Sequence, residues 1–220
     1  MPWWTVLLVL TLALLGAAFL WPWLVPDENQ RALERLSEVI RTWAGLRDIQ
    51  ADLVLLRPGE PVLRLGVLYL AGLAVRLEIK EPAELAGEVY ALRAVPEGWL
   101  LVHSRPKLSL GLEARFPEAV LGKILGELGN PSWEKLRVTT PKENTLAISG
   151  LTGPFAAVEL ELGETFSLPN RIVIFTNDGE RLEVQVQNLQ VNKGLELRDL
   201  LLLDPLPTRW IPIPIPEGGA

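Results

Sequence analysis

The chain has 220 residues, a formal net charge of -6 at pH 7 and a pI near 5.0. This acidic balance argues against a nucleic-acid partner, because binding to phosphates needs a basic surface. The chain has no cysteine, so disulfides and thiolate metal sites are excluded. Its 18 Pro and 18 Gly, together with many Leu and Val, are typical of an ordered, strand-rich domain with many turns.

The chain begins with a hydrophobic leader, residues 1–26. The 24 residues from Pro2 to Val25 carry no charge and are long enough to span a hydrocarbon core of about 30 Å. A signal peptide would need a basic start, which is missing. Tryptophans stand near both ends, where aromatic belts occur: Trp3, Trp4, Trp21 and Trp23. We therefore expect a retained transmembrane anchor, with cleavage after Ala18 as the alternative.

An amphipathic helix is predicted directly after the leader, with Asp27 as its N-cap and Gly45 just beyond its end. Its apolar residues recur at helical spacing: Leu33, Leu36, Val39, Ile40 and Trp43. This apolar stripe must lie on something apolar. The two alternatives are the domain's own sheet and a membrane surface.

From Arg47 onward the hydrophobic period changes to two, which predicts strands. They are expected near 48–56, 61–69, 73–79, 87–94, 97–104, 108–115, 134–140, 144–150 and 155–163, followed by a hairpin within 171–189. Turn signals separate them at 57–61, Ala71-Gly72, 96–98 and 177–179. A second helix is predicted over 117–128 and ends at Gly129-Asn130-Pro131.

These elements predict an α+β, mainly β domain over residues 27–207, with about ten antiparallel strands and two short helices. A sheet of that size with one apolar face must curl and bury that face, and the helices are available to cover it. Residues 208–220 form a Pro-rich tail that is restricted to extended conformations. The tail is either a frayed terminus or a docking peptide.

Residues for catalysis are scarce. His103 is the single histidine, lies on the same side of a predicted strand as Trp99 and Leu101, and has no metal-ligand partner at helical or hairpin spacing. A lone His in this setting is more often structural than catalytic. Phosphate-binding glycine loops and a G-x-S-x-G elbow are absent from the sequence. We therefore predict a non-enzyme without metal or cofactor, and the remaining feature is the apolar face itself.

Three stretches resemble the LolA/RseB-like superfamily, which includes the periplasmic carrier of outer-membrane lipoproteins. They are GLRDIQADLVL, VLYLAGLAVRLEIKEPAELAGEVYAL and NRIVIFTNDGERLEVQVQNLQVNKGLELRDLLLLDPLP. In the last stretch the resemblance implies a Leu-containing turn after Val-Asn and a final strand ending in Pro. The resemblance covers nearly everything after residue 27. It implies an unclosed antiparallel barrel with helices at its mouth and acyl chains bound between sheet and helices.

This sequence departs from the family at one turn. The carrier usually has an Arg-Pro pair between its second and third strands, with the Arg linked to lid opening. Here the turn reads Leu70-Ala71-Gly72-Leu73, so that polar latch is missing. A mainly apolar lid would have to open against hydrophobic contacts alone, at roughly 25 cal/mol per Å² of apolar area exposed.

The resemblance also implies a set of residues that line the cavity. Each of them would serve equally well in an ordinary packed core. The set is Leu63, Leu65, Val67, Tyr69, Leu77, Ile79, Trp99 and Leu101 from the strands, and Leu36, Ile40 and Trp43 from the first helix.

The resemblance implies a carrier or handover protein for acyl chains of lipoproteins or other lipids. The alternative is a membrane-anchored envelope module that senses lipid or binds an envelope protein. We expect it at the periplasmic face of the inner membrane, held by residues 2–25, or soluble in the periplasm if the leader is cleaved. One feature conflicts with this location, because the arginines after the leader favour the cytoplasm by the positive-inside rule: Arg31, Arg35, Arg41 and Arg47.

Overall fold

The computed structural model describes residues 30–60, 62–117, 137–151, 155–163, 168–201, 203 and 206–212. The leader, the predicted second helix beyond Pro117 and residues 213–220 of the tail lie outside this part. The chain divides into two compact units. Unit 1 contains residues 1–45 and 122–185, and unit 2 contains residues 46–121 and 186–220. None of the helices within the described residues is long and apolar enough to cross a membrane.

The described chain is mainly β, with twelve strands in one sheet rather than the predicted ten or so. The strands are β1 (Asp48–Leu56), β2 (Leu63–Leu70), β3 (Ala74–Glu81), β4 (Val89–Val95), β5 (Gly98–Arg105), β6 (Leu110–Phe116), β7 (Arg137–Lys142), β8 (Thr145–Ser149), β9 (Phe155–Leu162), β10 (Pro169–Thr176), β11 (Arg181–Val191) and β12 (Arg209–Pro212). The helices are α2 (Gln30–Ala44), the 3-10 turn η2 (Pro106–Leu108) and α4 (Leu197–Leu201).

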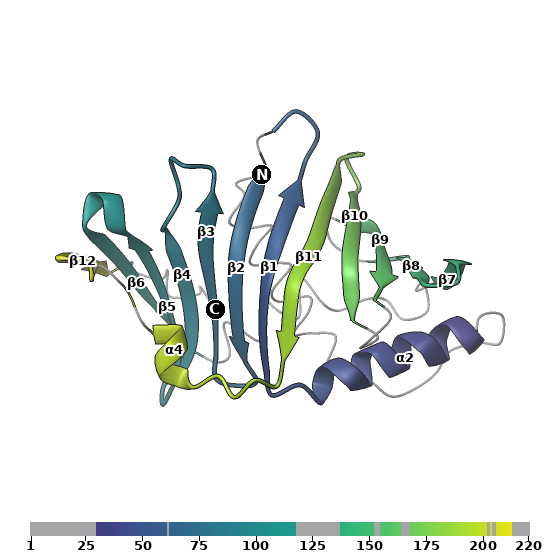
Figure 1. Cartoon of the computed structure of the whole chain (residues 1–220), viewed down its shortest axis with the longest axis horizontal. Coiled ribbons are helices and arrows are strands. Elements are labelled where there is room, and N and C mark those ends of the chain that lie inside the picture. Colours follow the sequence, from purple (N-terminus) through teal and green to yellow (C-terminus); the bar gives the residue numbers. More distant parts are fainter. Residues whose placement is uncertain are drawn as a thin grey trace, which may run out of the picture. The chain divides into compact units, whose positions relative to one another are not determined.

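The strand order is β12-β6-β5-β4-β3-β2-β1-β11-β10-β9-β8-β7, so the sheet is open, with β12 and β7 at its ends (Figure 1). Successive strands from β1 to β6 pair antiparallel, as do those from β7 to β11. Strand β11 is shared, because its first residues pair with β10 in unit 1 while its end belongs to unit 2. The predicted mainly β fold with an open sheet is therefore confirmed.

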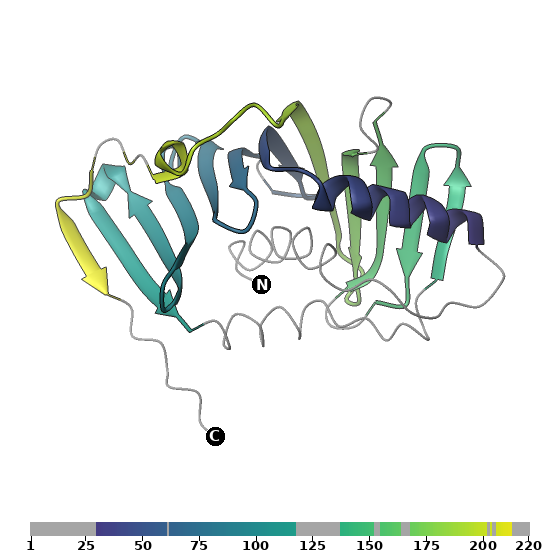
Figure 2. The same cartoon turned by 90° about the horizontal axis from the view of Figure 1, so that it is seen from below.

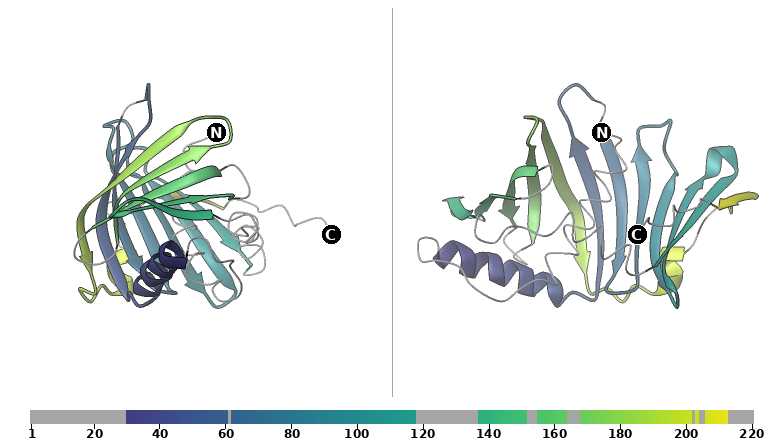
Figure 3. Two further views of the ribbon diagram at one scale, coloured as in Figure 1. Left: turned by 90° about the vertical axis from the view of Figure 1, so that its right-hand side faces the viewer. Right: turned by 180° about the vertical axis from the view of Figure 1, so that it is seen from behind.

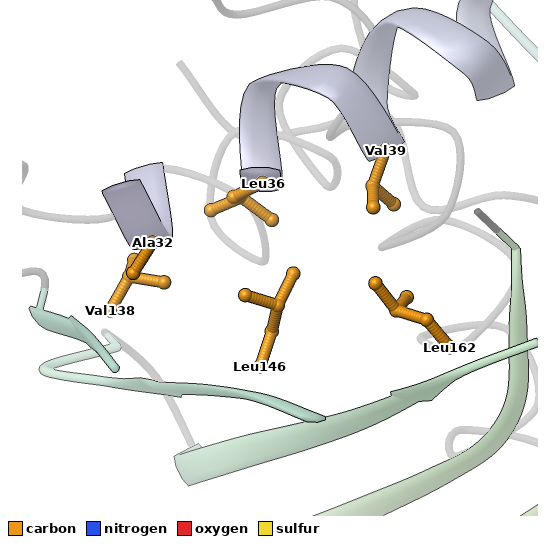
Figure 4. Close-up of a cluster of buried hydrophobic side chains, with 6 residues drawn as sticks. All are labelled: Ala32, Leu36, Val39, Val138, Leu146 and Leu162. Atoms are coloured by element: carbon orange, nitrogen blue, oxygen red, sulfur yellow. The ribbon is translucent and has the colours of Figure 1, made fainter. Parts of the chain in front are cut away.

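Unit 1 is built by α2 lying across β7, β8 and β9 (Figure 2). The helix ends at its predicted bound, where the Gly45 amide closes it by donating to the Arg41 and Thr42 carbonyls. The predicted N-cap, Asp27, lies outside the described residues. All five predicted apolar residues belong to one core cluster with the strands, so the stripe of α2 packs on the protein's own sheet. In Figure 4 the side chains meet across the interface: Ala32, Leu36 and Val39 from the helix, and Val138, Leu146 and Leu162 from the strands.

A polar contact fixes where α2 lies on this sheet. The Arg35 guanidinium donates to the Glu143 carbonyl and, over 3.0 Å, to Asn144 Oδ1 in the turn between β7 and β8. Because that turn sets the ends of both strands, Arg35 positions the helix along the same strands that its apolar side covers.

The other side of β9–β11 is polar and carries a charge network. Arg171 binds Glu183 through two hydrogen bonds of 2.7 and 2.9 Å, and Arg181 donates to the same carboxylate over 2.7 Å. The hydrogen bonds from Arg171 are the main reason that the pKa of Glu183 is lowered to about 2. This side of β9–β11 therefore carries a charge network, with the buried Val173 opposite Glu183.

Unit 2 is an antiparallel meander, β1–β6, whose strands run side by side in the right-hand view of Figure 3. The chain returns to it after β11 through a turn held by Asp48. The Asp48 carboxylate is buried and accepts hydrogen bonds from the Lys193 and Gly194 amides over 2.8 and 3.0 Å. Asn192 completes the turn, because its side chain accepts from the Arg47 amide over 2.8 Å.

The strand expected directly after this turn is replaced by a short helix. Residues Leu197–Leu201 form α4, which contacts β2 and β3 and buries Leu200 completely. The Glu196 amide donates to Asp199 Oδ2 over 2.8 Å, so a carboxylate three residues on caps the helix start. This local capping favours a helical turn at a place where the family pattern implied a strand.

The first part of the predicted Pro-rich tail forms an added edge strand. Strand β12 pairs parallel to β6, with Trp210 opposite Gly111. A Cβ built on Gly111 would lie 2.5 Å from Trp210 Cε3. The indole ring can lie here only because glycine has no side chain. The Thr208 and Arg209 amides both donate to the Ser109 carbonyl and fix the entry of the strand.

Leu146 is fully buried beneath α2, so Leu146→Ala should destabilise the folded chain by about 2–4 kcal/mol through the cavity it leaves. Urea unfolding measures this change. The control is Glu38→Ala on the exposed side of α2, which should change the free energy of unfolding by less than about 0.5 kcal/mol. Equal effects of the two substitutions would contradict the packing of α2 on β8.

Gly111→Val should displace Trp210 and release β12, because the new side chain occupies the position of the indole ring. Limited trypsin digestion, followed by mass spectrometry, should then show faster cleavage after Arg209. Trp210→Ala should also release the strand, and adding Gly111→Val to it should have no further effect. An unchanged cleavage rate in Gly111→Val would contradict the contact.

Candidate functional site

One side of the meander β2–β6 is apolar. In antiparallel pairs, residues directly opposite each other share a side of the sheet, so the register defines rows of neighbours. One row runs Tyr69, Val75, Leu92, Leu101 and Ala114 across five strands. The next runs Val67, Leu77, Tyr90, His103 and Leu112, and Leu65 pairs with Ile79 beside it. We call this side the apolar face of unit 2.

All eight strand residues predicted to line a cavity lie on this apolar face. Leu63, Leu65, Leu77 and Ile79 are buried. Val67, Tyr69, Trp99 and Leu101 are only partly buried. The face therefore mixes buried and partly buried residues, because Val75 and Leu92, which lie between Tyr69 and Leu101 in the same row, are buried.

The three helical residues of the predicted set lie in unit 1. Leu36 is a buried member of the cluster under α2, and Ile40 and Trp43 are partly buried against that cluster. The structure therefore assigns these three residues to the packing of α2 on β7–β9, and the eight strand residues to the apolar face of unit 2.

The opposite side of β1–β3 is polar. Lys80 reaches across β2 to Asp52 with 2.5 Å between Nζ and Oδ1, and Asn188 Nδ2 donates to the other Asp52 oxygen over 2.8 Å. The bond from Lys80 is the main reason that the pKa of Asp52 is lowered. Gly66 lies below the lysine stem, since a Cβ there would come within 3.1 Å of Lys80 Cε. The predicted alternation of polar and apolar sides is confirmed here.

A group of four polar side chains lies on the apolar face, at the start of β4 and the end of β5. We call Glu88, Tyr90, His103 and Arg105 the polar group. Glu88 is buried, with His103 Nε2 at 3.0 Å from one carboxylate oxygen and Arg105 Nε at 3.0 Å from the other. The Tyr90 and His103 rings stack, with centroids 4.0 Å apart and planes 13° from parallel.

The charges within the polar group balance. Burial is the main reason that the pKa of His103 is lowered, and it outweighs the opposing effect of Glu88. At pH 7 the imidazole is therefore neutral, and the Arg105 cation offsets the Glu88 anion. Burial also raises the pKa of the Tyr90 hydroxyl, to which the Glu88 charge adds.

Sequence reasoning found His103 but missed its partners. The signal was the turn at Pro96-Glu97, which joins two strands in a fixed register. That register pairs Tyr90 with His103 and continues to place Glu88 beside Arg105. Counting outward from the turn would have put all four side chains on one side of the hairpin.

The polar group has no arrangement for nucleophilic catalysis. Ser104 follows His103 but pairs with Val89, so it lies on the opposite side of β5. Within the residues that the structure describes, no three His, Asp or Glu side chains come close enough together to hold a metal ion. The arrangement can accept and donate hydrogen bonds beside an apolar surface.

Comparisons with known proteins concern the fold. No family model matches the chain, and no curated protein matches it. Among solved structures, an uncharacterized conserved protein from Thermus thermophilus matches with a TM-score of 0.57 and 18% identity, over 84% of this chain and all of that one. That similarity supports the fold alone.

More distant matches include a LolA superfamily protein from Nitrosomonas europaea, with a TM-score of 0.35, 11% identity, and coverage of 80% of this chain and 98% of that one. They also include the Pseudomonas aeruginosa MucA/MucB complex, with a TM-score of 0.44, 15% identity, and coverage of 77% and 60%.

The pH dependence of stability should report His103. Because burial holds its folded pKa below the ordinary 6.5, the folded protein binds fewer protons than the unfolded chain. As far as His103 is concerned, the free energy of unfolding is highest above about pH 6.5 and decreases as the pH falls below that value. The thermal midpoint of the wild type should decrease from pH 7 to pH 5. His103→Gln should show a clearly smaller decrease, and identical profiles would contradict a neutral, buried His103.

Proposed function

We propose that the chain is a non-catalytic protein of the bacterial cell envelope that binds acyl chains of lipoproteins or other lipids. The observation that carries this proposal is the apolar face of unit 2, on which all eight predicted strand residues lie while several keep accessible surface. Apolar ligands bind at mostly hydrophobic surfaces with a few polar groups, and the polar group supplies these.

The energetics of such binding need no reaction. Each methylene that leaves water for the apolar face contributes about 0.8 kcal/mol, so one acyl chain supplies enough for tight association. Tyr69 and Trp99 add large, partly accessible aromatic surfaces on β2 and β5. Release then requires a competing apolar site, as in a handover from one protein or membrane to the next.

We further propose that residues 2–25 anchor the chain, with the described units at the periplasmic face of the inner membrane. Anchoring favours handover over long-range shuttling. The arginines that follow the leader remain in conflict with this orientation, so it needs its own test. Sequencing the N-terminus of the membrane-extracted protein decides between anchor and cleavage, since a chain that begins at Phe19 would exclude the anchor.

Lipid binding is tested by purifying the full chain and identifying bound acyl lipids by extraction and mass spectrometry. Leu101→Gln should reduce the bound fraction, with an affinity loss of about five- to thirtyfold, because it removes apolar contact and buries an amide. Val102→Gln is the matched control, since the adjacent Val102 is also partly buried but lies on the opposite side of β5. A lipid-free wild type, or equal losses in both variants, would contradict the proposal.

Transfer of a labelled lipid between two vesicle populations separates carrier from sensor. A carrier accelerates transfer, and Leu101→Gln should slow it in proportion to its loss of binding. Binding without any acceleration would instead favour the alternative, a lipid-sensing or interaction module that holds its ligand and signals to an envelope protein.

A further inference from the structure

The polar group interrupts the apolar face of unit 2 at a defined place, beside Leu77 and Leu112 in the same row. We propose that Arg105 and His103, held in place by Glu88 and Tyr90, bind the uncharged polar head of the ligand, an ester carbonyl next to a hydroxyl, as in a monoacylglycerol. This assignment rests on the proposed lipid-binding function and adds a head-group preference to it.

A buried carboxylate is costly inside an apolar surface and is seldom kept for packing alone. Glu88 is only 7% exposed, and both of its oxygens are used within the hairpin, by His103 and by Arg105. Replacing such a pair by apolar side chains is often neutral or stabilising. The backbone ladder already holds β4 to β5, so the donors and acceptors that the polar group keeps are available to a ligand.

Arg105 still has donors to offer. Its Nε is bound to Glu88, while its two terminal nitrogens have no hydrogen-bond partner among the described residues. The side chain is 39% exposed, whereas the Glu88 side chain is 9% exposed. A carbonyl oxygen that approaches from the accessible side therefore meets the guanidinium and is kept away from the carboxylate.

His103 offers the complementary acceptor. A carboxylate can only accept, so the proton of the neutral ring lies on Nε2, which donates to Glu88. That leaves Nδ1 as an acceptor, and it has no partner in the part of the chain described. Stacking on Tyr90 fixes the ring plane, so Nδ1 is held in one direction. A hydroxyl is the head-group donor that fits it.

The balance of charge selects a neutral head. The Glu88 anion offsets the Arg105 cation at 3.0 Å, so the polar group presents no net positive charge to an incoming anion. A carboxylate or phosphate bound to Arg105 would lie within a few ångströms of Glu88 and be repelled by it. An ester and a hydroxyl satisfy the same donors and acceptors without that repulsion.

The test is a competition between two lipids with the same oleoyl chain. The full chain, held in amphipol at pH 7, is mixed with equal concentrations of 1-monooleoylglycerol and oleate, and native mass spectrometry gives the ratio of the two bound forms. Because the chains are identical, this ratio reports the head alone. Wild type should favour monooleoylglycerol by about thirtyfold, the value expected for two ordinary hydrogen bonds.

Two variants accompany the wild type. The triple variant Glu88→Leu, His103→Phe, Arg105→Met should bring the ratio close to one without leaving an unpaired buried charge. Arg115→Met on the opposite side of β6 is the matched control and should keep the wild-type ratio. Thermal unfolding of each variant checks that it is folded.

The outcomes separate the two levels of the proposal. Binding of both lipids with a ratio unaffected by the variants would overturn the head-group assignment and leave lipid binding intact. A wild type that prefers oleate would overturn it as well, because the site would then select an anion. Absence of both lipids from wild type and variants would overturn the proposed function itself, and this assignment with it.

Discussion

The register of the meander β2–β6 is the constraint on which the rest of unit 2 depends. Short turns join β2 to β3 and β4 to β5, and the turn length decides which residues lie opposite each other. A slip of one residue would move every side chain to the other side of the sheet. The turn after Val95 thus places Trp99, Leu101 and His103 beside the apolar residues of β4, and keeps Ser104 away from them.

The same register brings a buried carboxylate to an apolar surface without leaving it unpaired. Glu88, just before β4, lies next to the last residue of β5, Arg105, and two residues further along each strand Tyr90 stacks on His103. The apolar residues on either side lower the local polarity, which strengthens the Glu88 contacts and disfavours a charged His103. The polar group therefore depends both on the register between β4 and β5 and on the burial of Glu88 and His103.

Much of this architecture could be predicted because it is encoded locally. The spacing of Leu36 and Val39 specified α2, and alternation specified the strands and the face that carries Leu65 and Leu77. Asp199 is a local capping signal for α4, because its carboxylate accepts from the Glu196 amide. The helix was not predicted there because the family pattern implied a strand. Trp210 and Gly111 lie about a hundred residues apart in the sequence. Their contact could not be predicted, because a local sequence pattern contains no information on such distant pairing.

Both units combine buried and partly buried apolar residues. In unit 1, Val138 and Leu146 are 1% and 0% exposed, while Ile40 and Trp43 are partly buried. In unit 2, Leu63 and Leu65 are 1% and 0% exposed, and Val67, Tyr69, Trp99 and Leu101 are partly buried. A surface of this composition, with a charge-balanced polar group on it, is suited to an amphiphile. The proposed ligand would bind at the partly buried residues of the apolar face of unit 2.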